Sequence, residues 1–163
     1  MSFSKLSAEV LRKHKGKSFT GVGTVFFCHD GKGKFVMSKR SKNCRDEQGK
    51  WEVAGGGLKW GVVAEENVAR EVKEEFGAEV KKIKFMGYRD VFRKSEDGTP
   101  THWVMLDYAV EINPGDVKIN EPEMADEIGW FTPDNQPSPV HSQHSTFMKK
   151  YALQIEQILV SRA

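Results

Sequence analysis

The chain has 163 residues, of which 38% are hydrophobic and 29% are charged, with a formal net charge of only +2. This length allows one well-buried core and is too short for two ordinary domains, so we expect a single domain over residues 1–163. The composition excludes a disordered chain, and the charge gives no support for bulk affinity for nucleic acid. We expect no membrane-spanning segment and no signal peptide, because no apolar run has the required length. Cys28 and Cys44 have no metal-ligand or disulfide spacing, so we expect reduced thiols in a cytoplasmic protein.

The first half of the chain alternates between helical and strand patterns. Residues 5–14 are typical of a short amphipathic helix, with Leu6, Val10 and Leu11 on one side. Residues 19–30 and 31–40 are rich in β-branched and aromatic residues around a turn, which predicts two paired strands. A short strand at 50–56 runs into glycines, and a helix follows at 63–76.

The second half predicts three strands and a closing helix. Residues 80–94 and 101–112 alternate like two partners joined across the loop SEDGTP, and residues 127–133 form a last strand. Residues 144–163 predict a terminal helix capped by Ser145 or Thr146. Strands around one internal helix, with another at the end, indicate a mixed sheet between helices, an α/β or α+β fold.

The helix at 63–76 carries an unusual group of glutamates. At about 100° per residue, Ala64, Val68, Val72 and Phe76 form the core stripe, which leaves Glu75 at its margin and two further carboxylates close by, Glu71 and Glu74. Such a group is costly unless positive charge lies within it. Arg70, four residues from both Glu66 and Glu74, cannot balance the whole set, whereas Mg²⁺ prefers such oxygen ligands. The glycines at 55–57 let the backbone turn tightly and approach a metal or a phosphate. A solvated, salt-bridged helix face is the plain alternative for this helix alone.

The full spacing favours the metal site. Gly56 is followed in register by Arg70, Glu71, Val72, Glu74, Glu75 and Gly77. The segment resembles the Nudix box, G-x5-E-x7-R-E-U-x-E-E-x-G-U with U a bulky aliphatic, of the Nudix (MutT-like) hydrolases. The strand order and the closing EIGWFTP extend the likeness over most of the chain, which implies the Nudix fold, a mixed β-sheet sandwiched between helices. Three positions depart from the pattern: Val62 replaces the first glutamate, Ala54 a common proline, and Ala78 is a small final aliphatic.

The resemblance implies a reaction and a set of site residues. Nudix enzymes cleave a phosphoanhydride in a nucleoside diphosphate linked to a group X, with Mg²⁺ (or Mn²⁺ as a substitute) activating the attacking water. Carried over by position, the metal ligands are the carbonyl of Gly55 and the carboxylates of Glu71, Glu74 and Glu75. Arg70 would orient Glu71 or Glu74, and Glu71 or a later glutamate would act as the base.

Several residues outside the box are candidates for substrate binding, each with an ordinary structural alternative. Arg40 could reach a phosphate or be a surface cation at a strand end. Trp51, Trp103 and Phe92 could stack on a base or pack in the core, whereas Trp130 is assigned to packing. Of Glu121, Glu123 and Glu127, we rank the last two as candidates for an additional acidic residue of the site.

The sequence leaves the substrate open between (d)NTPs, modified nucleotides and nucleotide sugars. Residues 101–108 and 130–145 are similar to parts of GDP-mannose mannosyl hydrolases, with His141 and His144 as candidate bases for attack at a sugar carbon. The intact Arg70–Glu71 pair favours attack at phosphorus instead. Two further alternatives are a non-catalytic nucleotide-binding module, favoured only by Val62, and an RNA-decapping enzyme, for which the chain has little charge. A small-molecule nucleotide is the expected partner, with no membrane or stable nucleic acid, and a homodimer fits the family.

Overall fold

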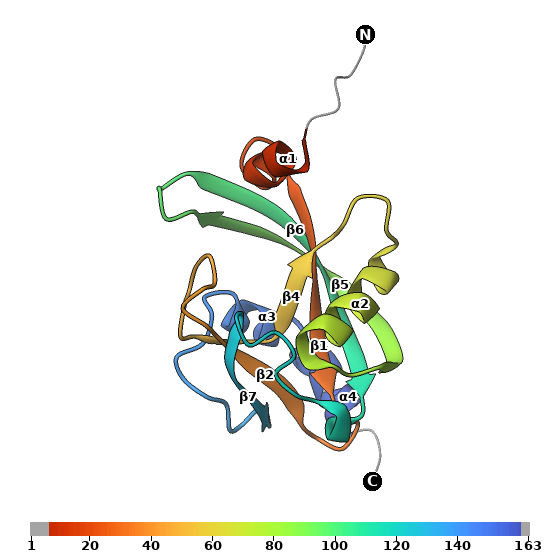
Figure 1. Ribbon diagram of the computed structural model, residues 1–163. Helices are drawn as coiled ribbons and strands as arrows, with labels where there is room; N and C mark the ends of the chain where they lie inside the picture. Colours follow the sequence, from red (N-terminus) through yellow and green to blue (C-terminus); the bar gives the residue numbers. More distant parts are fainter. Residues whose placement is uncertain (1–6, 161–163) are drawn as a thin grey trace.

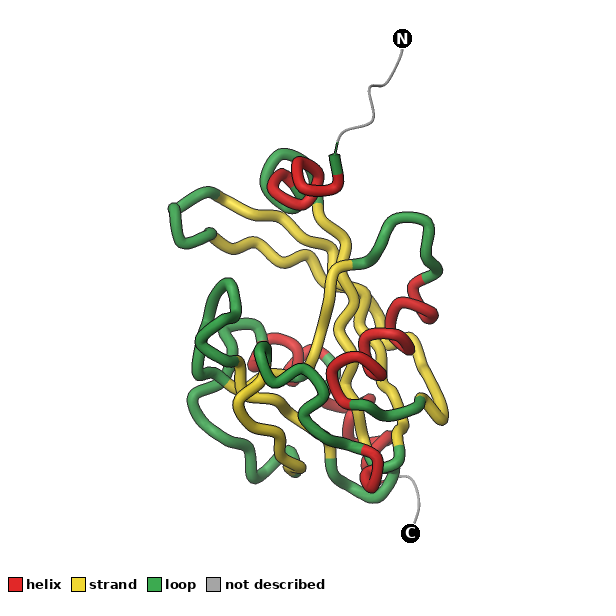
Figure 2. Tube along the Cα trace, viewed as in Figure 1, coloured by secondary structure: helices red, strands yellow, loops and turns green. Residues whose placement is uncertain are grey.

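A mixed seven-stranded sheet lies between helices in the computed structural model, which describes residues 7–160. The helix α2 covers one face of the sheet, and α3 and α4 cover the other (Figures 1 and 2). The strands follow the order β3-β2-β1-β6-β5, with β4 beside β1 and β7 beside β2. The predicted mixed sheet between helices is therefore confirmed. The elements are α1 (Ala8–His14), β1 (Gly21–His29), β2 (Phe35–Arg40), β3 (Trp51–Glu52), β4 (Ala54–Gly57), α2 (Ala64–Phe76), β5 (Val80–Lys94), β6 (Pro100–Ile112), a 3-10 turn η1 (Pro114–Asp116), β7 (Ala125–Phe131), α3 (His144–Lys150) and α4 (Ala152–Val160).

The sheet forks along one side of β1. One edge of β1 runs parallel to β6 over its whole length, from Gly21↔Trp103 to His29↔Glu111. The other edge pairs with β4 near its start and meets β2 at a single register pair, His29↔Phe35. The predicted pairing of β1 with β2 is thus correct but short. Because β2 and β4 leave β1 at different points, the sheet opens between them.

Of the remaining strands, β5 and β6 pair as predicted, and β7 joins a different part of the sheet. The hairpin of β5 and β6 joins Lys94 to Pro100 and is the longest antiparallel pairing in the sheet. The last strand, β7, adds to β2, so the predicted closing strand lies far from the hairpin. Trp130 on β7 packs against the core beneath α2, as predicted.

Alternate residues of β1 divide the core into two layers. Val25 and Phe27 face α3 and α4, whereas Phe26 and Cys28 face α2. This alternation is the ordinary consequence of the two-residue period of a strand. On α2, the predicted stripe is buried at Val68, Val72 and Phe76 together with the polar Asn67. Cys28 and Cys44 are both buried free thiols, as expected from their spacing.

The terminal helix differs from its prediction. Two helices, α3 and α4, replace the single helix, and Tyr151 separates them. The N-cap is Gln143, without a side-chain hydrogen bond, so the prediction of Ser145 or Thr146 as the cap was wrong. The two hydroxyl residues lie two and three positions after the cap, inside the first turn of α3. Leu6 and residues 161–163 fall outside the described residues. Within residues 7–160, none of the helices combines the length and apolarity needed to cross a bilayer.

Candidate active site

Arg70 forms hydrogen bonds with two carboxylates of α2 at the margin of the sheet. Its Nη1 donates to Glu74 at 2.6 Å and its Nη2 donates to Glu71 at 2.7 Å. Nη2 also donates to the buried Asn67 at 2.8 Å. Arg70 therefore contacts Glu71 and Glu74 together, and no ion pair joins it to Glu66 within residues 7–160.

Polar contacts of a buried residue connect this helix to β1 and to the loop after β4. Asn67 donates to the hydroxyl of Thr24 on β1 at 3.1 Å and accepts from the backbone of Lys59 at 3.3 Å. Asn67 and Thr24 are fully buried, so their bonds fix the register of α2 against the sheet. A side chain at Gly56 would place its Cβ 2.7 Å from the carboxyl carbon of Glu71. The glycine thus makes the space in which the Glu71 carboxylate lies against the backbone of β4.

Glu75 lies in the most acidic part of the site. Burial has the largest effect on its pKa, which is raised well above its ordinary value. Three neighbouring carboxylates raise it further: Glu52, Glu71 and Glu121. Glu52 comes from β3 and Glu121 from the loop before β7, so acidic groups from three parts of the chain meet at α2. Arg40 only partly offsets this charge.

The donor set suits a hard divalent cation. Carboxylate oxygens crowded in a partly buried site raise one another's pKa values unless a positive ion lies among them. Mg²⁺ takes oxygen ligands and retains waters, which fits carboxylates at an open margin. Within residues 7–160, no three His, Cys, Asp or Glu side chains already converge as a preformed metal-binding group. Glu71 and Glu74 are instead held by Arg70.

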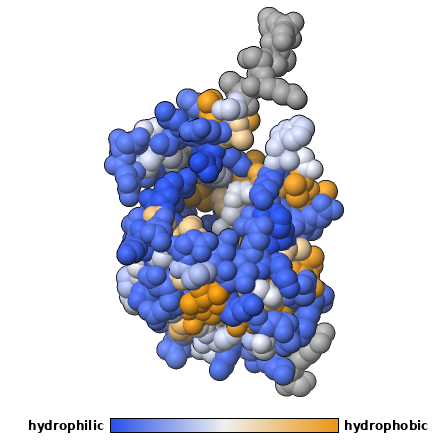
Figure 3. All heavy atoms as spheres, viewed as in Figure 1, coloured by the Kyte–Doolittle hydropathy of each residue, from blue (hydrophilic) through white to orange (hydrophobic). Residues whose placement is uncertain are grey.

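A pocket of about 480 Å³ begins beside this acidic group. Glu52, Arg40 and the glycines 55–57 line one part of it, and Arg89, His144 and Phe147 line another. The space-filling view shows this side of the molecule hollowed, with mainly hydrophilic residues around the opening (Figure 3). The pocket lies where the sheet forks. Its apolar lining comes from the core layer between the sheet and α3, including Val25, Met105 and Phe147.

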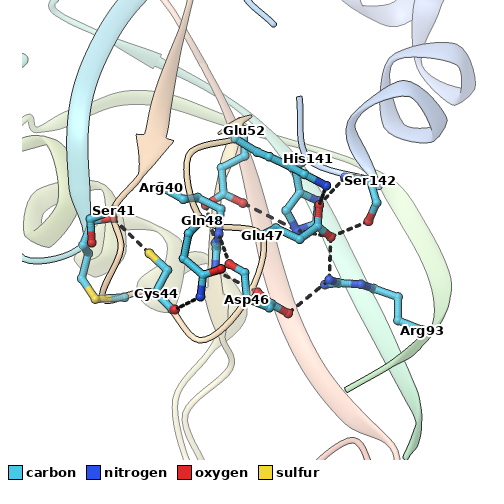
Figure 4. Close-up of polar contacts among 12 residues, drawn as sticks. Arg40, Ser41, Cys44, Asp46, Glu47, Gln48, Glu52, Arg93, His141 and Ser142 are labelled. Carbon is cyan, nitrogen blue, oxygen red and sulfur yellow. Dashed lines mark hydrogen bonds and ion pairs between the residues drawn. The ribbon is translucent and has the colours of Figure 1, made fainter. Parts of the chain in front are cut away.

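A charged network borders the same pocket (Figure 4). Arg40 donates to Glu52 at 2.6 Å and to the side chain of Asp46 at 2.9 Å. Arg93 on β5 donates to Glu47 at 2.6 Å and to Asp46 at 3.1 Å. These bonds join the loop after β2 to the distant hairpin strand β5, across the pocket.

Glu47 is the centre of that network. Besides Arg93, it accepts from the backbone N–H and the hydroxyl of Ser142, at 2.8 and 2.6 Å. Burial acts to raise the pKa of Glu47, but the bonds from Ser142, the neighbouring His141 and the bond from Lys50 together outweigh it and hold the pKa at about 2. His141 Nε2 lies 3.4 Å from the same carboxylate. Burial lowers the pKa of His141 to about 4, so this histidine is neutral at pH 7.

The other predicted substrate-binding residues lie in different surroundings. Arg40, Trp103 and His141 line the pocket, although the donors of Arg40 already have acceptors within the chain. Trp51 is buried in the core against Phe131 and is not among the pocket-lining residues of the described chain. On the surface, Glu127 pairs with Lys39 at 2.6 Å, Glu123 is exposed, and Phe92 is 71% exposed and stacked on His102.

The structure adds residues that the sequence did not single out. Asn67 lies on the buried stripe of α2, where a polar side chain needs a partner, and this signal was available in the sequence. Glu121, rather than Glu123 or Glu127, is the loop glutamate whose charge reaches Glu75. Glu52 and Arg89 lie on strands, and no local pattern in the sequence marks them as site residues, because the residues that they contact come from distant segments.

The chain is similar to known proteins over most of its length. Residues 19–151 match the family described as NUDIX domain. Over 93 residues the chain is 34% identical to the NAD-capped RNA hydrolase NudC of Vibrio vulnificus (strain CMCP6), covering 57% of this chain and 33% of that protein. Over 104 residues it is 27% identical to the nucleoside triphosphatase NudI of Enterobacter sp. (strain 638), covering 61% of this chain and 74% of that protein. The chain thus spans only about a third of the first relative.

Two solved structures have the same fold. A MutT NUDIX hydrolase from Burkholderia pseudomallei superposes with a TM-score of 0.70 at 25% identity, covering 80% of this chain and 97% of that one. A MutT protein from Methanosarcina mazei Go1 also gives a TM-score of 0.70, at 20% identity, covering 83% of this chain and 94% of that one.

Proposed function

The chain belongs to the Nudix (MutT-like) hydrolase family, and from this premise we propose that it hydrolyses a phosphoanhydride bond in a small nucleotide with the help of Mg²⁺. The observation that carries the proposal is the acidic group around Glu75, at one end of a pocket large enough for a nucleotide. The carbonyl of Gly55 and the carboxylates of Glu71, Glu74 and Glu75 would hold the metal. When bound, Mg²⁺ neutralises phosphate oxygens and lowers the pKa of a bound water.

The residues of the chain supply orientation and proton transfer. Arg70 holds Glu71 and Glu74 by short charged hydrogen bonds, which keeps both carboxylates facing the same margin. Asn67 accepts from Arg70 and is itself fixed by its buried bond to Thr24, so a buried side chain helps to position the group. One of these carboxylates accepts the proton of the water that attacks phosphorus. A nucleoside monophosphate is then among the products, as expected for an intact Arg70–Glu71 pair.

Replacing Glu75, the carboxylate that the other acidic groups surround, tests the metal site. We expect Glu75→Gln to lower Mg²⁺-dependent turnover by about 100-fold or more, because the amide removes a negative ligand and preserves the shape. Glu66→Gln is the matched control, since Glu66 is an exposed glutamate on the same helix. Circular dichroism should give the same folded spectrum for both variants. Equal turnover in Glu75→Gln and wild type would contradict the assignment.

Product analysis distinguishes the reaction classes. A panel of (d)NTPs, modified (d)NTPs, ADP-ribose, dinucleoside polyphosphates and GDP-sugars is incubated with Mg²⁺, with Glu75→Gln protein as the blank. Release of a nucleoside monophosphate supports the proposal and identifies the substrate. Release of free sugar and nucleoside diphosphate would move the base to His141 or His144. Tight binding without turnover would favour a nucleotide-sensing module. The proposal includes a cytoplasmic location, consistent with two free buried thiols.

A further inference from the structure

The pocket contains a buried arginine whose position is fixed on several sides. Arg89 on β5 has 6% of its surface exposed, and its Nε and Nη2 donate to the fully buried Asp107 at 2.7 and 2.9 Å. Tyr151 donates its hydroxyl to the same carboxylate at 2.7 Å. The ring of Phe147 lies 5.2 Å from the guanidinium carbon. Arg89 is therefore held rigidly, and Asp107 compensates its charge.

Two buried polar atoms in this region have no hydrogen-bond partner among the described residues. They are Nη1 of Arg89 and Nδ1 of His144, and both residues line the pocket. His144 is 5% exposed and lies three residues before Phe147, one helical turn along α3. Because buried polar groups are almost always hydrogen-bonded, these two atoms indicate a ligand that the pocket is built to receive.

The hydrogen bonds of Gln136 determine what His144 offers to a ligand. Gln136 uses its amide nitrogen to donate to the carbonyl of Pro133 at 2.7 Å, which leaves its Oε1 facing His144 Nε2 at 2.5 Å. Nε2 must therefore carry the proton, and Nδ1 of the neutral ring is an acceptor. Burial lowers the pKa of His144, which agrees with a neutral ring. The pocket thus presents one charged donor and one neutral acceptor.

We propose that Arg89 and His144 recognise the lactam edge of a nucleobase, the carbonyl accepting from Arg89 Nη1 and the adjacent ring N–H donating to His144 Nδ1. The inference rests on the proposed function for the premise that the ligand is a nucleotide. Guanine, hypoxanthine, uracil and thymine carry such an edge, whereas adenine and cytosine present a ring nitrogen beside an amino group. The lactam carbonyl can accept a hydrogen bond from Nη1, whereas the amino group of adenine or cytosine at the same place would set a donor against a donor, which favours the lactam.

The surroundings favour a base over a phosphate at this position. Asp107 already neutralises Arg89, so the site has no surplus positive charge for an anion. The lone pair of His144 Nδ1 would repel a phosphate oxygen. The apolar side chains of Phe147, Val91 and Met105 line the same pocket and suit the faces of a planar ring.

The test compares inosine and adenosine monophosphates, because the two bases differ only at the edge in question. Affinities are measured by isothermal titration calorimetry without metal, so that binding is read independently of turnover. We expect wild-type protein to bind inosine monophosphate about tenfold more tightly than adenosine monophosphate. Equal affinities, or tighter binding of adenosine monophosphate, would overturn the inference.

Two substitutions at His144 separate the acceptor from the surrounding structure. His144→Gln keeps a polar group where Nε2 contacts Gln136 but has no acceptor at the Nδ1 position, so the tenfold preference should disappear. His144→Asn keeps an acceptor at the Nδ1 position and loses the contact with Gln136, so the preference should persist. The ratio of the two affinities within one protein cancels any general loss of folded protein. An unchanged ratio in His144→Gln would contradict the role of His144.

The outcome can be separated from that of the proposed function. Turnover that depends on Glu75 without any preference between the two bases would leave the hydrolase proposal standing and refute this one. A preference that His144→Gln abolishes, in a protein without turnover on any substrate, would retain the base site and refute the hydrolase proposal.

Discussion

At the scale of single residues, the site depends on glycines and on paired charges. Gly56 is the clearest case, because the carboxylate of Glu71 occupies the space next to its Cα. Its neighbour Gly57 is different, since a Cβ there would meet only the flexible end of Lys15 at 3.5 Å. Of these two adjacent glycines, only Gly56 is required by the space that Glu71 occupies.

This difference predicts the behaviour of two alanine variants. Gly56→Ala should lower hydrolysis by about 10- to 100-fold, because the methyl group displaces Glu71 from the position in which Arg70 holds it. Gly57→Ala should lower the rate much less, because a methyl group there does not displace Glu71. Initial rates at saturating Mg²⁺ measure the effect, and thermal melting checks that both variants fold. Equal rates for the two variants would show that Glu71 does not need this space.

At the scale of elements, the end of α2 explains the last glycine of the box. Gly77 has φ +68° and ψ 2°, a left-handed conformation, and its N–H donates to the carbonyl of Lys73. Residues with a Cβ are strained in that conformation, so glycine ends the helix with little cost. The direction of the chain from α2 into β5 depends on this cap.

We therefore expect Gly77→Ala to lower the free energy of unfolding by about 1 kcal/mol. Gly77→Asn should cost less, because asparagine tolerates the left-handed region better than alanine. Urea denaturation of the three proteins provides the measurement. A Cβ at this position would also approach Lys118 Cε at 2.8 Å, but that side chain is flexible and can move. If the Gly77→Ala variant proved as stable as the wild-type protein, the left-handed cap would not constrain the end of the helix.

At the scale of the whole molecule, Glu47 connects segments far apart in the chain. Its carboxylate receives donors from Arg93 on β5, from Ser142 before α3 and from Lys50. Glu47 itself has a positive φ of 50°, which is uncommon for a residue other than glycine. The bonds to its carboxylate stabilise that backbone and bring the loop after β2 to the pocket.

This connection predicts a pH dependence of stability. The pKa of Glu47 is about 2 in the folded state, below the ordinary value of 4.5. A carboxylate whose pKa is lower in the folded state stabilises the fold at pH values above its unfolded-state pKa. This contribution is lost as the pH falls from about 4.5 toward 2. Glu47→Gln should therefore be less stable than wild type at pH 7, and the difference should become small as the pH falls through about 2.

Urea denaturation at several pH values tests this expectation. Glu96→Gln is the control, because Glu96 is an exposed glutamate in the loop between β5 and β6. The control should follow the wild-type curve at every pH. A difference between Glu47→Gln and wild type that persists unchanged at pH 2 would mean that the charge of Glu47 does not stabilise the fold.

The sequence by itself determined the features that depend on neighbouring residues. The period of α2, the alternation of β5 and β6 and the spacing from Gly56 to Gly77 are all local, so the order of elements, the family and the group of box carboxylates could be predicted. The split of the terminal helix at Tyr151 and its Gln143 cap could not, because tertiary packing decided both against the local signals of Ser145 and Thr146.

Only the tertiary structure decided which distant residues meet. Trp51 and Trp103 look equivalent in sequence, yet one is buried in the core and the other lines the pocket. Glu52, Glu121 and Glu75 come from separate elements and affect one another only after the sheet has formed. The pairing of Arg89 with Asp107 likewise depends on the register of β5 against β6, which no local pattern contains, because hydrogen bonds between strands join residues by position in space rather than in the chain.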